Sequence, residues 1–170
     1  AMASANNAPR MLGQSASFLE MQEHISLVAP LNKPVLIVGE RGTGKELVAA
    51  RLHFLSRRWE QRFLKINCAA MSESLLEALL FGHEAGAVTG ASKQRKGLFE
   101  RADGGTLFLD ELANTAMVVQ EKILRVIEYG EFERLGGNET LQVDVRLIAA
   151  TNEDLPQLAQ QNRFREDLLD

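Results

Sequence analysis

The stretch Gly39-Glu-Arg-Gly-Thr-Gly-Lys45-Glu46 decides the fold class of this 170-residue chain. It follows the apolar run 35–38 and precedes the apolar-periodic segment 47–55, so the order is strand, glycine-rich turn and helix. Glycines let backbone N–H groups converge on a polyphosphate, and the helix N-terminus adds positive partial charge. We therefore predict a phosphate-binding loop, made of Gly39, Glu40, Arg41, Gly42, Thr43, Gly44, Lys45 and Glu46.

Lys45 and Glu46 differ in how well they fit the usual pattern of such loops. Lys45 would reach the β- and γ-phosphates as a positive charge. Glu46 stands where Ser or Thr normally touches Mg²⁺, so we expect the metal to be held by other groups or through water. The alternative for the whole stretch is a glycine-rich turn that contains a lysine and binds no phosphate.

Composition predicts a soluble, globular chain. Hydrophobic residues make up 45% and charged residues 25%, and no apolar run is long enough to span a membrane. The formal net charge of −4 makes the chain a poor DNA binder by itself, because phosphate contacts need clustered Lys and Arg. Two basic spots, Arg57-Arg58 and residues 93–96, are predicted to be solvated surface.

Cys68 is the single cysteine of the chain, so an internal disulfide is excluded. We predict that it is a buried structural thiol in a reducing compartment.

Hydrophobic periodicity predicts strands that alternate with helices. We expect helices at 14–29, 45–56, from 72 onward, at 99–102, at 117–128 and from 154, strands at 34–38, 63–67, 106–109 and 145–150, and a β-ribbon over 131–134 and 141–145. Residues 82–97 show neither period and are predicted to form a long loop that is functional or mobile. The alternation predicts an α/β fold with a parallel sheet and right-handed crossovers.

Asp110 and Glu111 end the buried strand expected at 106–109. In parallel α/β sheets the carboxyl ends of the strands face the ligand. An Asp there can hold Mg²⁺, and the adjacent Glu can deprotonate an attacking water. The structural alternative is that both acids cap the next helix. Together with the phosphate-binding loop, the pair predicts nucleotide hydrolysis.

Two asparagines and one loop leave alternatives open. Asn152 could feel the γ-phosphate or position the water, or it could cap the following helix. Asn67 could hydrogen-bond Glu111 and hold it away from the water, or it could be a turn residue. The segment Gly86-Ala-Val-Thr-Gly-Ala91 is uncharged and nearly all small, which suits a mobile contact point but also an ordinary surface loop.

Six motifs together resemble the AAA+ domain of bacterial enhancer-binding proteins, the activators of sigma-54 RNA polymerase. They are the Gly39-to-Glu46 loop, Asn67-Cys-Ala-Ala70, Phe81-Gly-His-Glu84, Gly86-Ala-Val-Thr-Gly-Ala91, Phe108-Leu-Asp-Glu111 and Ala150-Thr-Asn152. The resemblance covers roughly residues 12–170, and Glu46 is usual in this family. It implies a three-layer αβα AAA+ P-loop NTPase core over 11–170. Residues 1–10 are small and polar, and we expect them to form a disordered leader.

The resemblance also implies a mechanism. A cytoplasmic hexameric ring would hydrolyse ATP with Mg²⁺ between subunits. Asp110 would serve the metal, Glu111 would polarise water, Asn67 would be the switch partner of Glu111, and Asn152 would be the first sensor. Arg165 matches an arginine that reaches the neighbouring subunit's γ-phosphate. A loop would press on sigma-54 and remodel the closed promoter complex; it consists of Gly86, Ala87, Val88, Thr89, Gly90 and Ala91.

Two features depart from the family pattern. Val88 stands where the family has an aromatic residue, usually Phe, and offers less apolar area for a contact with sigma-54. The chain ends at Asp170, before the family's second arginine, helical lid and DNA-binding helix-turn-helix. We therefore expect a truncated core with DNA contact only through that absent segment and no contact with a membrane. The alternatives are a nucleotide- or partner-binding module without hydrolysis, or another AAA+ machine such as a clamp loader, against which the 86–91 loop argues.

Overall fold

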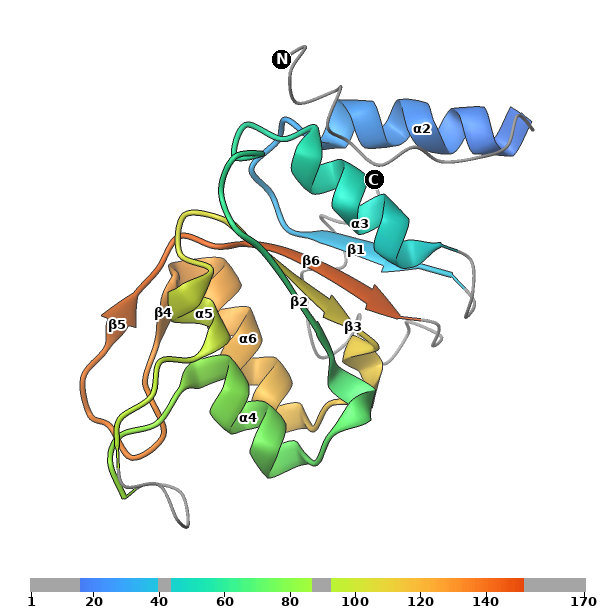
Figure 1. Ribbon diagram of the computed structural model, residues 1–170. Helices are drawn as coiled ribbons and strands as arrows, with labels where there is room; N and C mark the ends of the chain where they lie inside the picture. Colours follow the sequence, from blue (N-terminus) through green and yellow to red (C-terminus); the bar gives the residue numbers. More distant parts are fainter. Residues whose placement is uncertain (1–15, 40–43, 87–92, 152–170) are drawn as a thin grey trace.

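The computed structural model describes residues 16–39, 44–86 and 93–151 (Figure 1). In chain order, the helices and strands of this part are α2 (Ala16–Val28), β1 (Val35–Val38), α3 (Lys45–Phe54), β2 (Phe63–Asn67), α4 (Glu73–Phe81), α5 (Leu98–Arg101), β3 (Thr106–Asp110), α6 (Met117–Tyr129), β4 (Glu131–Phe132), β5 (Leu141–Gln142) and β6 (Arg146–Thr151). Short 3₁₀ turns, Cys68–Ala70 and Leu112–Asn114, follow β2 and β3. The predicted alternation of strands and helices is confirmed, and the helix expected from residue 154 lies outside the described residues.

Four parallel strands form the central sheet, in the order β1-β6-β3-β2. Val38 of β1 is in register with Thr151 of β6. Asp110 at the end of β3 is in register with Ala150 of β6 and with Asn67 of β2. The last residues of the four strands therefore lie along one edge of the sheet, which we call the carboxyl edge; the opposite edge is the amino edge.

Helices cover both faces of the sheet, which gives an αβα sandwich (Figure 1). α2 and α3 pack on one face, in a cluster that includes Ile25, Val48, Leu52, Phe108 and Ile148. α4, α5 and α6 pack on the other face, in a cluster that includes Leu80, Phe99, Ile123, Leu107 and Leu109. Each such side chain, when fully buried, contributes about 1.5–3 kcal/mol. The predicted α/β fold class is confirmed.

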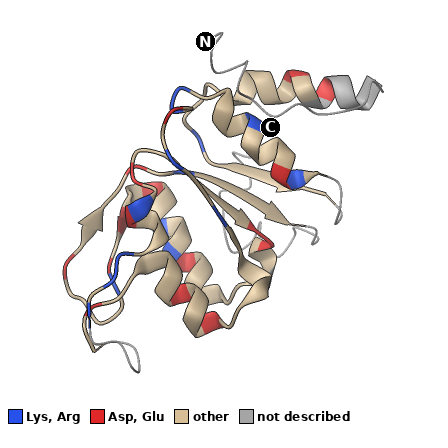
Figure 2. Cartoon of the chain, in the orientation of Figure 1, with Lys and Arg blue, Asp and Glu red and all other residues tan. Residues whose placement is uncertain are grey.

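Charged residues lie mainly on helices, loops and strand ends, while the strand ribbons between the helix layers are mostly uncharged (Figure 2). Within residues 16–39, 44–86 and 93–151, no helix combines the length and the apolar character that crossing a bilayer requires.

Arg58 is not solvated surface, although the basic spot at Arg57-Arg58 predicts it. Its side chain is 13% exposed. The guanidinium donates to the carbonyl oxygens of Gly105, at 2.9 Å, and Asp144, at 3.2 Å, and to Oδ1 of Asn32, at 2.8 Å. The prediction was wrong because these partners come from segments 26 to 86 residues away in the sequence. Arg57 and residues 93–96 are exposed, as predicted.

The segment 82–97, predicted to be a loop without secondary structure, is paired at its base. The backbone N–H of His83 donates to Arg95 O at 3.0 Å, and the N–H of Arg95 donates to His83 O at 2.9 Å. These bonds form an antiparallel bridge. A second bridge pairs His83 with Leu135 in parallel. Isolated bridges of this kind have no sequence period, so hydrophobic patterning does not reveal them.

We call residues 82–86 and 93–97 the loop stem. Gly82 and Gly97 hold its two sides in close contact. A Cβ on Gly97 would lie 2.4 Å from Gly82 N and 2.5 Å from Leu80 O, inside the contact limit for carbon. Only glycine at this position allows the two backbones to approach so closely.

Candidate nucleotide site

The carboxyl edge of the sheet brings together the described residues of the predicted site. β1 leads into Gly39, whose N–H donates to Thr151 O at 3.2 Å. β2 ends at Asn67, β3 ends at Asp110, and α3 begins at Lys45. Parallel strand topology therefore gathers residues that are distant in the sequence, at the edge where open α/β sheets bind ligands.

Lys45 is buried at the start of α3, at 8% exposure. Its Nζ donates to Gly39 O at 2.9 Å, so the side chain returns toward the end of β1. Gly44 has a φ of +83°, a left-handed conformation that favours glycine, and turns the chain into the helix. The ammonium group and the N-terminus of α3 thus place positive charge at the carboxyl edge.

Asp110 has a buried carboxylate oxygen, Oδ1, that has no hydrogen-bond partner in the described part of the chain. An unsatisfied buried acceptor costs about 1–3 kcal/mol, so it needs an explanation. Side chains alternate along a strand, and Phe108 packs against α3, so Asp110 lies on the same face of the sheet as α3. A carboxylate oxygen placed beside the helix that starts the phosphate-binding loop fits a Mg²⁺ ligand.

Glu111 follows in an unusual backbone conformation, with φ 60° and ψ 45°. Among the described residues it is the only non-glycine with a positive φ. The left-handed region costs a residue with a Cβ about 1–2 kcal/mol, and such strain concentrates at functional sites. Glu111 is 6% exposed. It occupies the N-cap position of the 3₁₀ turn that follows, and its side chain makes no capping hydrogen bond to that turn.

Cys68 lies close enough to Asp110 and Glu111 for their charges to affect its pKa. Its side chain is buried at 3% exposure, as predicted. Burial raises the pKa of the thiol to about 12, and the negative charges of Asp110 and Glu111 add to the rise. A thiol with this pKa stays protonated at neutral pH, so Cys68 is structural and not a nucleophile.

Asn67 takes the turn role in this structure. Its Oδ1 accepts a hydrogen bond from the N–H of Ala69 at 2.9 Å and caps the 3₁₀ turn Cys68–Ala70. The side-chain amide nitrogen is not engaged by this bond. The switch role with Glu111 stays a prediction.

Glu46, the departure in the loop pattern, pairs with a residue that the sequence did not single out. Lys65 Nζ donates to Glu46 Oε1 at 2.6 Å, and both side chains are more than half exposed. The Glu46 carboxylate is therefore directed toward β2. The signal that could have indicated Lys65 is its position two residues before Asn67, on the same face of the strand.

Several predicted site residues lie outside the described residues. They are Glu40, Arg41, Gly42 and Thr43 of the phosphate-binding loop, Ala87, Val88, Thr89, Gly90 and Ala91 of the predicted contact loop, and Asn152 and Arg165. Gly86, the first residue of the contact loop, is described and has a φ of +79°.

Comparison with known sequences decides the family. The profile of the sigma-54 interaction domain matches residues 11–170. This chain belongs to the sigma-54 interaction domain family. It is 65% identical over 160 residues to the Psp operon transcriptional activator of Escherichia coli K12, which covers 94% of this chain and 49% of that protein. It is 52% identical over 158 residues to the Nif-specific regulatory protein of Azotobacter vinelandii, covering 93% of this chain and 30% of that protein. This sigma-54 interaction domain thus spans half or less of the length of these two relatives.

Solved structures agree with this assignment. NtrX from Brucella abortus in complex with ATP superposes with a TM-score of 0.80 at 38% identity, over 94% of this chain and 34% of NtrX. The same protein in complex with ADP gives 0.80 at 36% identity, over 99% of this chain and 36% of NtrX. A P-loop NTPase domain of a sigma-54 activator from E. coli, at 18% identity and a TM-score of 0.56, shows the fold alone.

Arg134 is a further residue of this sigma-54 interaction domain that the sequence did not indicate. Its side chain is 12% exposed. Nε and Nη2 donate to the two carboxylate oxygens of Glu100, each at 2.8 Å, and Nη1 donates to Glu84 in the loop stem at 3.0 Å. The bonds to both acids raise the pKa of Arg134 above its usual range. Bonds from Gln94 and Arg134 lower the pKa of Glu84. Arg134 therefore joins the loop stem to α5 through charge-assisted bonds.

Proposed function

We propose that this chain is the ATP-hydrolysing AAA+ core of a sigma-54-dependent transcriptional activator, with the core over residues 11–170. One observation supports it most directly. The buried, unpartnered carboxylate oxygen of Asp110 lies at the same sheet edge as the ammonium of Lys45. The family match and the complexes of NtrX with ATP and ADP support an adenine nucleotide as the ligand.

The phosphates of ATP would bind at the N-terminus of α3. There they would replace Gly39 O as the partner of Lys45, because a charged oxygen is the stronger acceptor. Asp110 would hold Mg²⁺, directly or through water, and the metal would neutralise charge on the β- and γ-phosphates.

Glu111 would act as the general base. It would take a proton from water as the water oxygen bonds to the γ-phosphorus, while the bond to the β-phosphate oxygen breaks and ADP leaves. Its strained backbone is consistent with a carboxylate held at a required position. Asn67 would be the switch partner of Glu111. It ends β2, which lies two strands away from β6 in the sheet. Asn152, the residue after β6, would be the sensor of the γ-phosphate.

Assembly and partners complete the proposal. A cytoplasmic hexameric ring would bring Arg165 of one subunit to the γ-phosphate of its neighbour, and a trans arginine can raise the rate by orders of magnitude. The loop of residues 86–91 would contact sigma-54 RNA polymerase, with Val88 at its tip. The loop stem and Arg134 would give this loop a firm base. Contact with DNA would come from a segment outside this chain.

Replacing the loop lysine tests the nucleotide site. Lys45→Ala should weaken ATP binding by at least about tenfold, because it removes a charge-assisted bond to phosphate. Binding is measured by titration with a fluorescent ATP analogue, and the unfolding temperature shows that the fold is kept. Lys33→Ala is the matched control, since Lys33 is an exposed lysine before β1. Equal ATP affinity of wild type and Lys45→Ala would contradict the assignment.

A further inference from the structure

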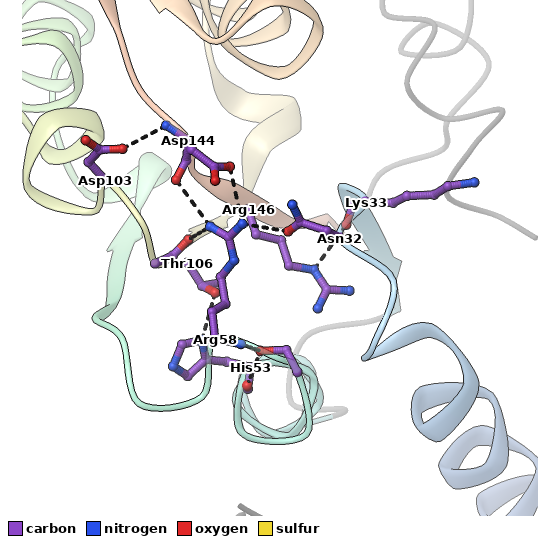
Figure 3. Close-up of polar contacts among 10 residues, drawn as sticks. Asn32, Lys33, His53, Arg58, Asp103, Thr106, Asp144 and Arg146 are labelled. Atoms are coloured by element: carbon purple, nitrogen blue, oxygen red, sulfur yellow. Dashed lines mark hydrogen bonds and ion pairs between the residues drawn. The ribbon is translucent and has the colours of Figure 1, made fainter. Parts of the chain in front are cut away.

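A cavity of about 550 Å³ lies at the amino edge of the sheet, away from the candidate nucleotide site. Its lining includes three arginines, Arg57, Arg58 and Arg146, and the amide side chain of Asn32. Figure 3 shows the Arg58 and Arg146 side chains near one another, with Asn32 beside them. These residues come from three places in the chain, which the fold gathers around one opening.

Arg146, the first residue of β6, is buried at 3% exposure. Its guanidinium donates to three backbone carbonyls: Nε to Lys33 O at 3.1 Å, Nη1 to Ala29 O at 2.6 Å and Nη2 to Val28 O at 3.1 Å. A guanidinium has five N–H groups, so these bonds leave one on each terminal nitrogen for another acceptor. In the part of the chain that the structure describes, no carboxylate pairs with Arg146.

The positive charge of Arg146 is therefore only partly compensated. Burial, and then the charge of Arg58, lower the pKa of Arg146 to about 10, so the side chain is still charged at neutral pH. The carbonyls at the end of α2 supply a partial negative charge of about half a unit. Buried charges are normally paired with a full opposite charge, and the remaining positive potential faces a cavity.

Asp144 and Asp103, the acids of this region, do not pair with Arg146. Asp144 Oδ1 accepts from Arg58 Nη2 at 3.2 Å, and the Asp144 side chain is 74% exposed. Asp103 is occupied by the backbone N–H of Asp144, at 2.8 Å. Asn32 Oδ1 accepts a hydrogen bond from Arg58 Nη2, which leaves the NH₂ group of Asn32 as a donor. Arg57 is exposed and makes no ion pair within the described ranges.

We propose that this cavity is a binding site for a small oxyanion, with Arg146 and Arg57 as the cationic donors and Asn32 as a neutral donor. Guanidinium groups bind phosphate and carboxylate oxygens through the same paired geometry, so the shared chemistry is the oxyanion. β6 has six residues and spans about 20 Å, so the site is separate from the phosphate-binding loop and does not rest on the proposed function. An anion here connects the end of α2 to β6 through Arg146.

Titration with inorganic phosphate tests this inference in the Lys45→Ala chain, which removes the loop lysine. Ionic strength is held constant with sodium chloride, and the Nε–H signal of Arg146 is followed by NMR. We expect a saturable shift of this signal and a rise in the unfolding temperature. Arg57→Gln, added to Lys45→Ala, should weaken phosphate binding about tenfold. Lys96→Gln, which removes an exposed lysine that does not line the cavity, should leave it unchanged.

Asn32→Asp provides a second test that needs no added ligand. It places a carboxylate in the cavity, so the chain should unfold at a higher temperature, and phosphate should no longer raise that temperature. A parallel titration with acetate separates the two sources: a response to phosphate alone indicates a free phosphate group, and an equal response indicates an acidic side chain. Absence of a saturable Arg146 shift with both anions, or an undiminished response in Arg57→Gln, would overturn the proposal.

Discussion

Asp110 combines burial of a carboxylate oxygen with the absence of a hydrogen-bond partner for that oxygen among the described residues. A residue selected for stability alone would not keep this arrangement. Asp110→Asn should therefore stabilise the chain by about 1 kcal/mol, because it removes a buried charge. The same change should weaken the proposed binding of Mg²⁺. Urea unfolding of both chains measures the change.

Two further readouts accompany the Asp110→Asn variant. The pKa of Cys68 should fall from about 12, since the Asp110 charge contributes to its rise. Mg²⁺ should increase the ATP-dependent stabilisation of the wild type but not of the variant. A less stable Asp110→Asn chain would show that Asp110 takes part in a stabilising pair, which would contradict its place as a metal ligand.

His53 makes folding stability depend on pH. It is 1% exposed; Nε2 lies 3.0 Å from Gln61 O, which can only accept, so Nε2 carries the proton and Nδ1 accepts from Thr106 Oγ1 at 2.7 Å. Burial lowers the pKa of His53 below 6.5. Above pH 6.5 the ring is neutral in both states, and below it the unfolded chain takes up a proton that the folded chain does not. Stability should therefore fall as the pH is lowered from 6.5 toward the folded-state pKa, by at most about 1.4 kcal/mol per pH unit.

Urea unfolding between pH 8 and pH 5 measures this dependence. His53→Gln should flatten the curve below pH 6.5, whereas His24→Gln, at an exposed histidine, should leave its shape unchanged. A His53→Gln curve with the wild-type slope would assign the proton uptake to another group.

Residue types at strand ends predicted the candidate site, but not its geometry. Asp110 and Glu111 were recognisable because two acids follow an apolar strand. The left-handed backbone of Glu111 was not, because glutamate has no preference for it and only the surrounding fold holds it there. The contacts of Arg146 could not be predicted from the sequence either, because its acceptors lie 113 to 118 residues earlier in the chain.

At the scale of elements, the loop stem depends on two glycines that face each other. Gly97→Ala should destabilise the chain by about 3 kcal/mol, because the new Cβ would meet backbone atoms that cannot rotate away. It should also speed hydrogen exchange at the amides of His83 and Arg95, which form the bridge.

Gly104→Ala is the control for this prediction. Its cost should be about 1 kcal/mol, from the positive φ alone, because a Cβ there would meet nothing within 4 Å. The His83 amide should exchange at the wild-type rate in this variant. Unchanged exchange at His83 in Gly97→Ala would mean that close backbone contact does not hold the stem.

Helices and strands were predictable because apolar residues recur along each of them at the spacing typical of that structure. α3, β2 and α6 begin where the pattern places them, since a face of each is buried against the sheet. The loop stem was not predictable, because its stability comes from two isolated bridges at His83 and from Arg134, which lies 50 residues from Glu84 in the sequence. Contacts of that range are a property of the fold and not of a local pattern.

At the scale of the whole molecule, the parallel sheet separates two charged regions. Its carboxyl edge holds Lys45, Asp110 and Glu111, and its amino edge holds Arg58 and Arg146. The chain spans half or less of the length of the two relatives described above. In the proposed reaction Arg165 would act on the neighbouring subunit, so ATP turnover by this chain should depend on its assembly.

ATP turnover per chain, measured over a range of protein concentrations, tests the central claim most directly. The account predicts that turnover rises with concentration as subunits assemble, because the arginine acts in trans. Glu111→Gln should keep ATP binding and lose turnover at every concentration, since it removes the general base. Bound ATP with no turnover by the wild type at any concentration would contradict the account and leave a binding module.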